Sequence, residues 1–436
     1  MGKSTVSNKD RLQIWQPLAV RDFLLLFIGE SVSILGNQFY LVALPWLTLQ
    51  LTNSPVSLGT VLMAAAVPRA IFMLLGGVVS DRLPPRFIML VSNALRTILT
   101  ALLTALVASG MTQLWHLYLF SLSFGVIDGF FIPAAKSIIP TLVKKELLAA
   151  SNALSQGTTQ LLMLIGPALG GLLIATTGIV TAFTIDAASF LFTTVTLLLM
   201  KNSQKQSVTT QQVDLTSELQ QAPSSSMRKP TIASKMAGLI AGIREGLIYT
   251  WHNPALRAVL LVITMLNLVF MGPLQVGIAS LAQSRFPGGV VALGTMNSAW
   301  GGGALLGTLM PGVLYRLPRL GILMLTLASI QGFGLLLLGF IPNIVWASVT
   351  IAVLGYCSGF FTVVGITWIQ KQTSPDMLGR VMSLGMLSSF GVAPFSYALA
   401  GLLANFNLTF LFCVAGSIML TVSVLLTTNV SVRTIN

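Results

Sequence analysis

The stretch GVVSDRLPPR at residues 77–86 joins two long apolar segments, and a similar stretch, GVLYRLPR, occurs at residues 312–319. Each has the pattern of a glycine-bearing helix end, a basic turn and the start of another apolar run. The two copies lie about 235 residues apart in a chain of 436 residues, as expected for a duplicated membrane unit. We therefore predict two similar halves, each containing this hairpin.

The composition of the chain is that of a membrane protein. Hydrophobic residues make up 54% of the sequence and charged residues 8%, and the mean hydropathy is +0.86. In water-soluble domains about a quarter of the residues are charged. The net charge of +13 comes from basic residues in short turns between apolar runs, so it predicts membrane topology and not a nucleic-acid partner.

Cysteine and histidine are too few and too scattered for a metal site or a disulfide framework. Cys357 and Cys413 each fall inside an apolar run, while His116 and His252 lie near predicted helix ends. We therefore predict no metal and no cofactor. No phosphate-binding loop with GK[ST] occurs, which argues against direct ATP hydrolysis.

Twelve apolar stretches reach the length of about 20 residues that a helix needs to cross a bilayer. The predicted spans are residues 23–47, 57–80, 87–109, 114–136, 152–176, 179–200, 255–281, 291–314, 321–340, 343–369, 380–404 and 407–428. These spans predict an all-α membrane protein of two pseudo-symmetric six-helix bundles, residues 23–200 and 255–428.

Lysine and arginine in the turns predict the orientation of the chain. They gather in alternate turns, which carry Arg82 and Arg86, Lys144 and Lys145, the residues from Lys201 to Arg257, Arg316 and Arg319, and Lys371 and Arg380. The turns between these contain a single basic residue, Arg285. Basic turns stay on the cytoplasmic side. We therefore predict that the tail 1–22, the segment 201–254 and the tail 429–436 are cytoplasmic.

Residues 1–22 are polar and basic and contain no apolar core, so the first span is expected to stay attached rather than act as a cleaved signal. Residues 201–233, rich in Ser, Gln and Thr, are typical of a flexible tether. From Ser234 to His252 apolar residues recur at helical spacing, which predicts an amphipathic helix on the inner membrane surface.

A second internal similarity supports the duplication. KKELLAASN at residues 144–152 corresponds to PDMLGRVMS at residues 375–383, about 231 residues later. Because this offset is close to that of the first pair, we interpret the chain as a duplicated six-helix unit.

The hairpin at residues 77–86 resembles the loop between the second and third helices of the major facilitator superfamily. Gly77, Asp81, Arg82 and Arg86 match its pattern, whereas Pro84 and Pro85 replace a glycine and an arginine. The resemblance implies a cytoplasmic gate, which Arg96 of the third span would join by binding Asp81 or Asp128. In the second copy Tyr315 precedes Arg316, whereas Asp81 precedes Arg82 in the first, so Arg316 and Arg319 have no local acid.

The stretch LIGPALGG at residues 164–171 resembles the antiporter motif of exporters in this superfamily. Gly166, Pro167, Gly170 and Gly171 carry the match. Small residues allow close helix approach and proline relaxes one backbone hydrogen bond, so a bendable helix contact is expected. The alternative is ordinary helix packing.

Several further stretches together resemble the branch of the superfamily that includes enterobactin exporters and macrolide efflux proteins. These are SVSILGNQFYLVALPWLTLQLTNSP at 31–55, FFIPAAKSIIPTLV at 130–143, IDAASFL at 185–191, REGLIYTWHNPALRAVLLV at 244–262 and GRVMSL at 379–384.

Polar residues recur along the first span. Glu30, Ser33, Asn37 and Tyr40 are spaced three and four residues apart and share one helix face, which we predict to line a water-filled path. The resemblance agrees, because the first helix of superfamily folds lines the central cavity. Glu30 is the first candidate for the group that carries the proton. The alternative is a fixed ion pair with Arg21 or with a base of a neighbouring span.

Charged residues within the other spans each need a partner or a function. Arg69, near the middle of the second span, is expected to bind an acid, either Glu30 or Asp128, or else to contact an anionic substrate. Asp128, which shares a helix face with Ser121, and Asp186 are further candidates for proton coupling. For Asp186 a structural role is the alternative.

Candidate substrate contacts are polar residues without charge. They are Gln156, Thr159 and Gln160 in the fifth span, with Asn267, Gln275, Asn297, Gln331 and Thr367 in the second half. The spans of the second half contain no acid, so coupling is expected in the first half. The 18 methionines suit an adaptable apolar cavity, although filling of gaps in the core explains them equally well.

These observations, together with the resemblance, predict a secondary transporter in a bacterial inner membrane that exports a small amphipathic compound in exchange for protons, and a monomer is expected. A dedicated siderophore exporter is the alternative. A membrane enzyme is disfavoured because the spans contain no paired catalytic set, and a channel because no filter motif is visible. A receptor that transports nothing is the remaining class.

Overall fold

The computed structural model describes residues 14–80, 83–201, 242, 244–313 and 320–427, and every regular element within these ranges is helical. The helices of the first half are α2 (Arg21–Thr52), α3 (Pro55–Ser80), α4 (Pro85–Ala108), α5 (Leu114–Leu142), α6 (Leu148–Thr177) and α7 (Ile179–Leu199). Those of the second half are α10 (Pro254–Gly272), α11 (Ile278–Ser284), α12 (Val290–Val313), α13 (Leu320–Leu338), α14 (Ile344–Gln372), α15 (Pro375–Phe390), α16 (Ala393–Phe406) and α17 (Leu408–Thr427). Three short turns also occur: η1 (Gln16–Ala19), η2 (Lys145–Leu147) and the π turn η4 (Pro273–Gly277).

Each of the twelve predicted spans coincides with helix, so the prediction of an all-α membrane fold is confirmed. Within the described chain, eleven helical stretches are long and apolar enough to cross a membrane. The predicted span 291–314 forms α12, which has 24 residues and is not among these eleven stretches. This helix packs between α6 and α14, where Gly301 and Gly303 permit close approach to the backbones of both neighbours.

Two predicted spans are interrupted. The seventh, predicted at 255–281, consists of α10, the π turn η4 and α11, and the interruption begins at Pro273, which has no N–H to donate. The eleventh, predicted at 380–404, divides at Gly391 and Val392 into α15 and α16, directly before Pro394. The sequence predicts each of these two spans as one continuous helix, and for both the structure differs.

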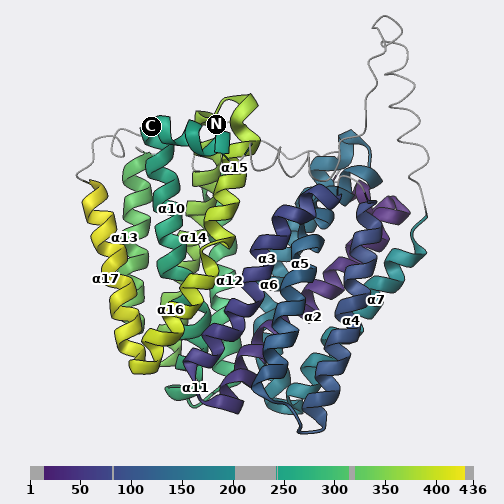
Figure 1. Cartoon of the computed structure of the whole chain (residues 1–436), viewed down its shortest axis with the longest axis horizontal. Helices are drawn as coiled ribbons and strands as arrows, with labels where there is room; N and C mark the ends of the chain where they lie inside the picture. The colour runs from purple at the N-terminus through teal and green to yellow at the C-terminus, as the bar shows by residue number, and fades with distance from the viewer. Residues whose placement is uncertain (1–13, 81–82, 202–241, 243, 314–319, 428–436) are drawn as a thin grey trace, which may run out of the picture.

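The two halves lie side by side, with α2 to α7 on one side and α10 to α17 on the other (Figure 1). They meet mainly through α6 against α12 and α3 against α16. Glycine permits this approach, since a Cβ on Gly171 would lie 2.7 Å from the backbone oxygen of Val290. The described chain begins and ends at the same face, the upper one in Figure 1, which we call the terminal face. The opposite, far face carries the turns at residues 53–54, 109–113 and 285–289.

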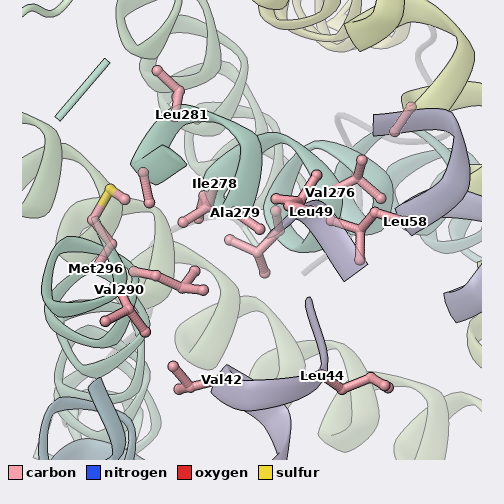
Figure 2. Packing of buried hydrophobic residues seen from close by; sticks show 14 of the residues in the cluster. Val42, Leu44, Leu49, Leu58, Val276, Ile278, Ala279, Leu281, Val290 and Met296 are labelled. Carbon is pink, nitrogen blue, oxygen red and sulfur yellow. The ribbon is translucent and has the colours of Figure 1, made fainter. Parts of the chain in front are cut away.

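An apolar cluster seals the two halves together toward the far face. Figure 2 shows Leu49 and Leu58 of the first half near Val276, Ile278 and Ala279 of η4 and α11, and Val42 and Leu44 belong to the same cluster. A side chain reinforces the seal, because Gln283 Nε2 donates to the backbone oxygen of Leu49 at 3.0 Å and to Asn53 Oδ1 at 3.2 Å. These bonds cap the end of α2 from the other half of the molecule.

The linker is described only at its end. Of the amphipathic helix predicted from Ser234 to His252, residues 242 and 244–252 are helical, and the rest lies outside the described residues. This segment packs on the start of α15: Glu245 forms an ion pair with Arg380, and the N–H of Ser374 donates to Tyr249 Oη at 3.5 Å. The linker end is therefore attached to the second half.

Candidate functional site

Three charged residues meet near the middle of three helices in the first half. Asp128 of α5 lies between two arginines, Arg69 of α3 and Arg96 of α4. Arg69 Nη2 lies 2.8 Å from Asp128 Oδ2, and Arg96 Nη2 donates to the other oxygen, Asp128 Oδ1. One carboxylate thus holds two guanidinium groups, and the three residues together carry one net positive charge.

The ion pairs with Asp128 stabilise the two arginines at this depth, since an unpaired cation in the hydrocarbon region costs free energy. Arg96 is also placed over aromatic rings, 4.1 Å from the centroid of Phe131 and 5.5 Å from that of Phe190. The acid that sequence reasoning sought for Arg69 is Asp128. The side chain of Arg69 is 32% exposed, whereas that of Arg96 is 8% exposed, so Arg69 is the more accessible of the two.

Glu30 stands apart from this cluster. Its Oε1 is buried and has no hydrogen-bond partner, and Glu30 takes part in no ion pair within the described chain. Arg21, its alternative partner, donates instead to the backbone oxygen of Leu199 at 3.3 Å. Arg96 is close enough to act on Glu30 electrostatically.

The other residues of the predicted stripe on the first span differ in surroundings. Ser33 is buried and Asn37 is half-buried. Tyr40 lies in the packed interior of the first half, with ring centroids 5.0 Å from Phe124 and 6.0 Å from Phe183. The structure therefore places Tyr40 among aromatic side chains and not along an open path.

Further polar side chains are enclosed in the first half without partners in the described chain. Both carboxylate oxygens of Asp186 and the hydroxyl of Ser121 are buried and lack a hydrogen bond. Sequence reasoning missed Asn93 and Thr100, which are also buried and unpaired. The available signal was their spacing, because Asn93, Arg96 and Thr100 share one face of α4.

A cavity of about 340 Å³ lies in the second half between α10, α14 and α15. Its lining includes four aromatic residues, Phe270, Trp300, Phe361 and Phe390, and three methionines, Met271, Met382 and Met386. Asn267 and Gln331 contribute amides, and none of the described residues in the lining is charged. Asn267 Nδ2 donates to the backbone oxygen of Ile263 at 2.9 Å. Of the other predicted contacts in this half, Gln275, Asn297 and Thr367 do not line this cavity.

A second cavity, of about 240 Å³, lies between the halves. Gly77 of α3 and Lys136 of α5 line it from the first half, and Met386 and Phe390 of α15 from the second. Since Met386 and Phe390 also line the first cavity, the two cavities adjoin. Gly77 and Lys136 lie close to the ends of their helices at the terminal face, so this space is on the side opposite the seal.

The polar patch of the fifth span lines neither of these cavities. Gln156 of α6 is exposed and Gln160 is half-buried. The hydroxyl of Thr159 donates to the backbone oxygen of Ser155 at 2.9 Å.

The glycine–proline stretch of α6 lies where three helices meet. Gly166 and Gly170 pack on Gln38 and Phe39 of α2, and Gly171 packs on α12 of the other half. The N–H of Ala168, directly after Pro167, donates to Ser298 Oγ of α12 at 2.8 Å. The stretch therefore forms part of the contact between the halves.

The gate hairpin is described in part. Asp81, Arg82, Arg316 and Arg319 lie outside the described residues. Arg86 donates from Nε to the backbone oxygen of Leu197 at 2.8 Å and from Nη2 to that of Leu198 at 3.1 Å, so the start of α4 caps the end of α7.

Two helical halves, sealed at one face and holding charged groups and adjoining cavities between their helices, define a polytopic membrane transporter. The profile of the Major Facilitator Superfamily matches residues 26–395. The chain belongs to this superfamily, whose members are transporters and not enzymes.

Solved structures of the same fold and curated relatives agree with this placement. The nucleoside transporter NupG superposes with a TM-score of 0.68 at 14% identity, covering 93% of this chain and 98% of the other. The multidrug efflux pump Tap of Mycolicibacterium fortuitum is 24% identical over 389 residues, which is 88% of this chain and 89% of Tap. Macrolide efflux protein A of Streptococcus pyogenes is 22% identical over 88% of this chain and 89% of its own length. The enterobactin exporter EntS of Shigella boydii is 26% identical over 83% of this chain and 80% of its own length.

Proposed function

We propose that this transporter exports a small amphipathic compound from the bacterial cytoplasm in exchange for protons. The observation that carries the proposal is the division of labour between the halves: the acids and arginines at membrane depth lie in the first half, and the charge-free cavity lies in the second. The names of the curated relatives support export of drug-like molecules.

The positive-inside pattern assigns the terminal face to the cytoplasm. With the far face sealed and the second cavity on the cytoplasmic side, this conformation is the one that loads substrate from inside. Export then requires the halves to rock, so that the contacts of α6 with α12 and of α3 with α16 open while the gate hairpins close. Substrate and proton would each favour a different conformation.

Glu30 is the proposed proton carrier, because it can gain or lose a proton without breaking an ion pair. Asp128 is less suited to that role, since neutralising it would leave Arg69 and Arg96 unpaired. Asp186 is a second site for a proton, as its carboxyl is enclosed without a partner in the described chain.

The test is transport in proteoliposomes with an imposed proton gradient. Glu30→Gln should abolish exchange driven by the gradient while substrate still binds, and Glu146→Gln, which alters an exposed acid of η2, should behave as the parent protein. If Glu30→Gln kept full gradient-driven exchange, the role of Glu30 would be wrong. Absence of transport with either direction of gradient would contradict proton antiport itself.

A dedicated siderophore exporter is the alternative, supported by similarity to the enterobactin exporter. Siderophores often carry anionic groups, which an arginine free to face the cavity would bind, but Arg69 is paired with Asp128. Comparing the growth medium of a deletion strain with that of its parent under iron limitation separates the two. A siderophore missing from the medium would favour the alternative.

A further inference from the structure

The two adjoining cavities differ in chemistry. The larger, in the second half, is lined by aromatic rings, methionines and neutral polar groups. The smaller, between the halves, has one charged residue in the described part of its lining, Lys136. A molecule that spans both would therefore place an uncharged body in one and meet a cation in the other.

Lys136 is a free cation within the described chain. It is exposed, and none of the ion pairs in these ranges includes it. Among the described residues no acid lines either cavity, and Asp376, the single acid between residues 254 and 427, lies at the start of α15 and outside both linings. The described walls around the amino group of Lys136 therefore supply no counter-ion.

The neighbouring charges add to this positive character. On the same helix as Lys136, Asp128 is already shared between Arg69 and Arg96, so that cluster is itself positive by one charge. Glu30 and Asp186, the other acids on which Arg96 acts electrostatically, are absent from the linings of both cavities. A cationic ligand would meet repulsion here, and an anionic one would gain an ion pair.

The aromatic rings favour a ligand of the opposite charge, since ring faces attract cations. They lie mainly in the cavity of the second half, whereas Phe390 together with Met386 connects it to the space beside Lys136. An aromatic cavity that continues into a space beside a lysine suits a molecule with an aromatic or aliphatic body and one acidic end. It does not suit a molecule whose basic group must lie next to Lys136.

We propose that the substrate is an amphipathic anion, whose apolar body occupies the cavity of the second half and whose carboxylate or comparable acidic group binds Lys136. This inference rests on the proposed export function and adds the charge class of the compound. Lys136 is then the residue that selects for charge.

The experiment compares three probes that share one apolar body and differ in charge: 1-pyrenebutyrate, its methyl ester and 1-pyrenebutylamine. Binding to the purified full chain in nanodiscs is followed by energy transfer from tryptophan to pyrene. The carboxylate should bind about tenfold more tightly than the amine. Lys136→Gln should remove this preference, Lys136→Glu should reverse it, and Lys136→Arg should keep it. Lys144→Gln, which removes an exposed lysine outside both cavities, is the matched control and should change nothing.

Equal binding of the three probes, or tighter binding of the amine, would overturn the anionic class. A preference for the carboxylate that survives in Lys136→Gln would overturn the role of Lys136. Failure of the export function has a different signature, because it leaves these binding preferences in place while proteoliposomes accumulate no probe under either direction of the proton gradient.

Discussion

The two halves share a fold but differ in what their helices carry. Each span of the first half is one uninterrupted helix in the described chain, and the interior of this half holds Arg69, Arg96 and Asp128. The second half has two interrupted spans and a cavity without charge. Phe270 lies just before the first interruption and Phe390 just before the second, and both line that cavity.

This difference indicates how the two copies of one unit divide coupling and substrate binding between them. Ion pairs at membrane depth need fixed partners, which continuous helices provide. An adaptable cavity needs local freedom of the backbone, which a π turn and a helix break provide. We therefore expect substitutions in the first half to change coupling and stability, and substitutions in the second to change affinity for the substrate.

The largest effect is expected from Asp128→Asn. It leaves Arg69 and Arg96 without a counter-ion in the membrane interior, and breaking a buried ion pair in this way costs about 3–5 kcal/mol. Thermal unfolding in nanodiscs should show a lower unfolding temperature, and gradient-driven transport should be lost. Asp376→Asn, at an exposed acid of α15, is the control. An unchanged unfolding temperature for Asp128→Asn would show that the first half does not depend on this cluster.

A smaller effect is expected from Gly171→Ala, which acts on the contact between the halves. The added methyl would meet the backbone of Val290, and a forced shift of this kind costs about 1–3 kcal/mol. The sealed conformation should become less populated, so spin labels at Gln50 and Pro287, which are exposed at the far face, should give longer distances. Gly157→Ala lies on the same helix with open space around it and should leave the distances unchanged. Identical distances in both variants would remove Gly171 from the seal.

Phe270→Ala tests the second half directly. It removes one ring of the pair with Trp300, whose centroids are 5.3 Å apart, from the wall of the cavity. Substrate affinity should fall about tenfold through lost apolar and ring contacts, while the number of protons exchanged per substrate stays the same. Phe333→Ala, on an exposed surface of α13, serves as control. A changed proton stoichiometry would contradict the separation of the two tasks.

Sequence reasoning found the helices because their determinants are local. Apolar length predicted the twelve spans, and the high cost of an unpaired guanidinium predicted an acid for Arg69. It did not find what depends on contacts between helices. Periodicity placed Tyr40 on a face with Glu30, but it could not show that Phe124 and Phe183 cover that tyrosine. Nothing in the local sequence distinguishes Lys136 from the lysines that set membrane topology. Only its position in the lining of a cavity indicates a different role.

The smallest effect is expected from Gln283→Ala, which removes the two hydrogen bonds that cap α2 from the second half. The apolar cluster of the seal remains, so the sealed conformation should lose only about 0.5–1.5 kcal/mol of stability. Labels at the far face should report a modest shift toward the open conformation, and the transport rate should change less than about tenfold. Ser284→Ala is the control, because its hydroxyl bonds within its own half, to the backbone oxygen of Ser280 at 2.8 Å. If Gln283→Ala opened the seal as strongly as Gly171→Ala, polar capping and not apolar packing would hold the two unlike halves together.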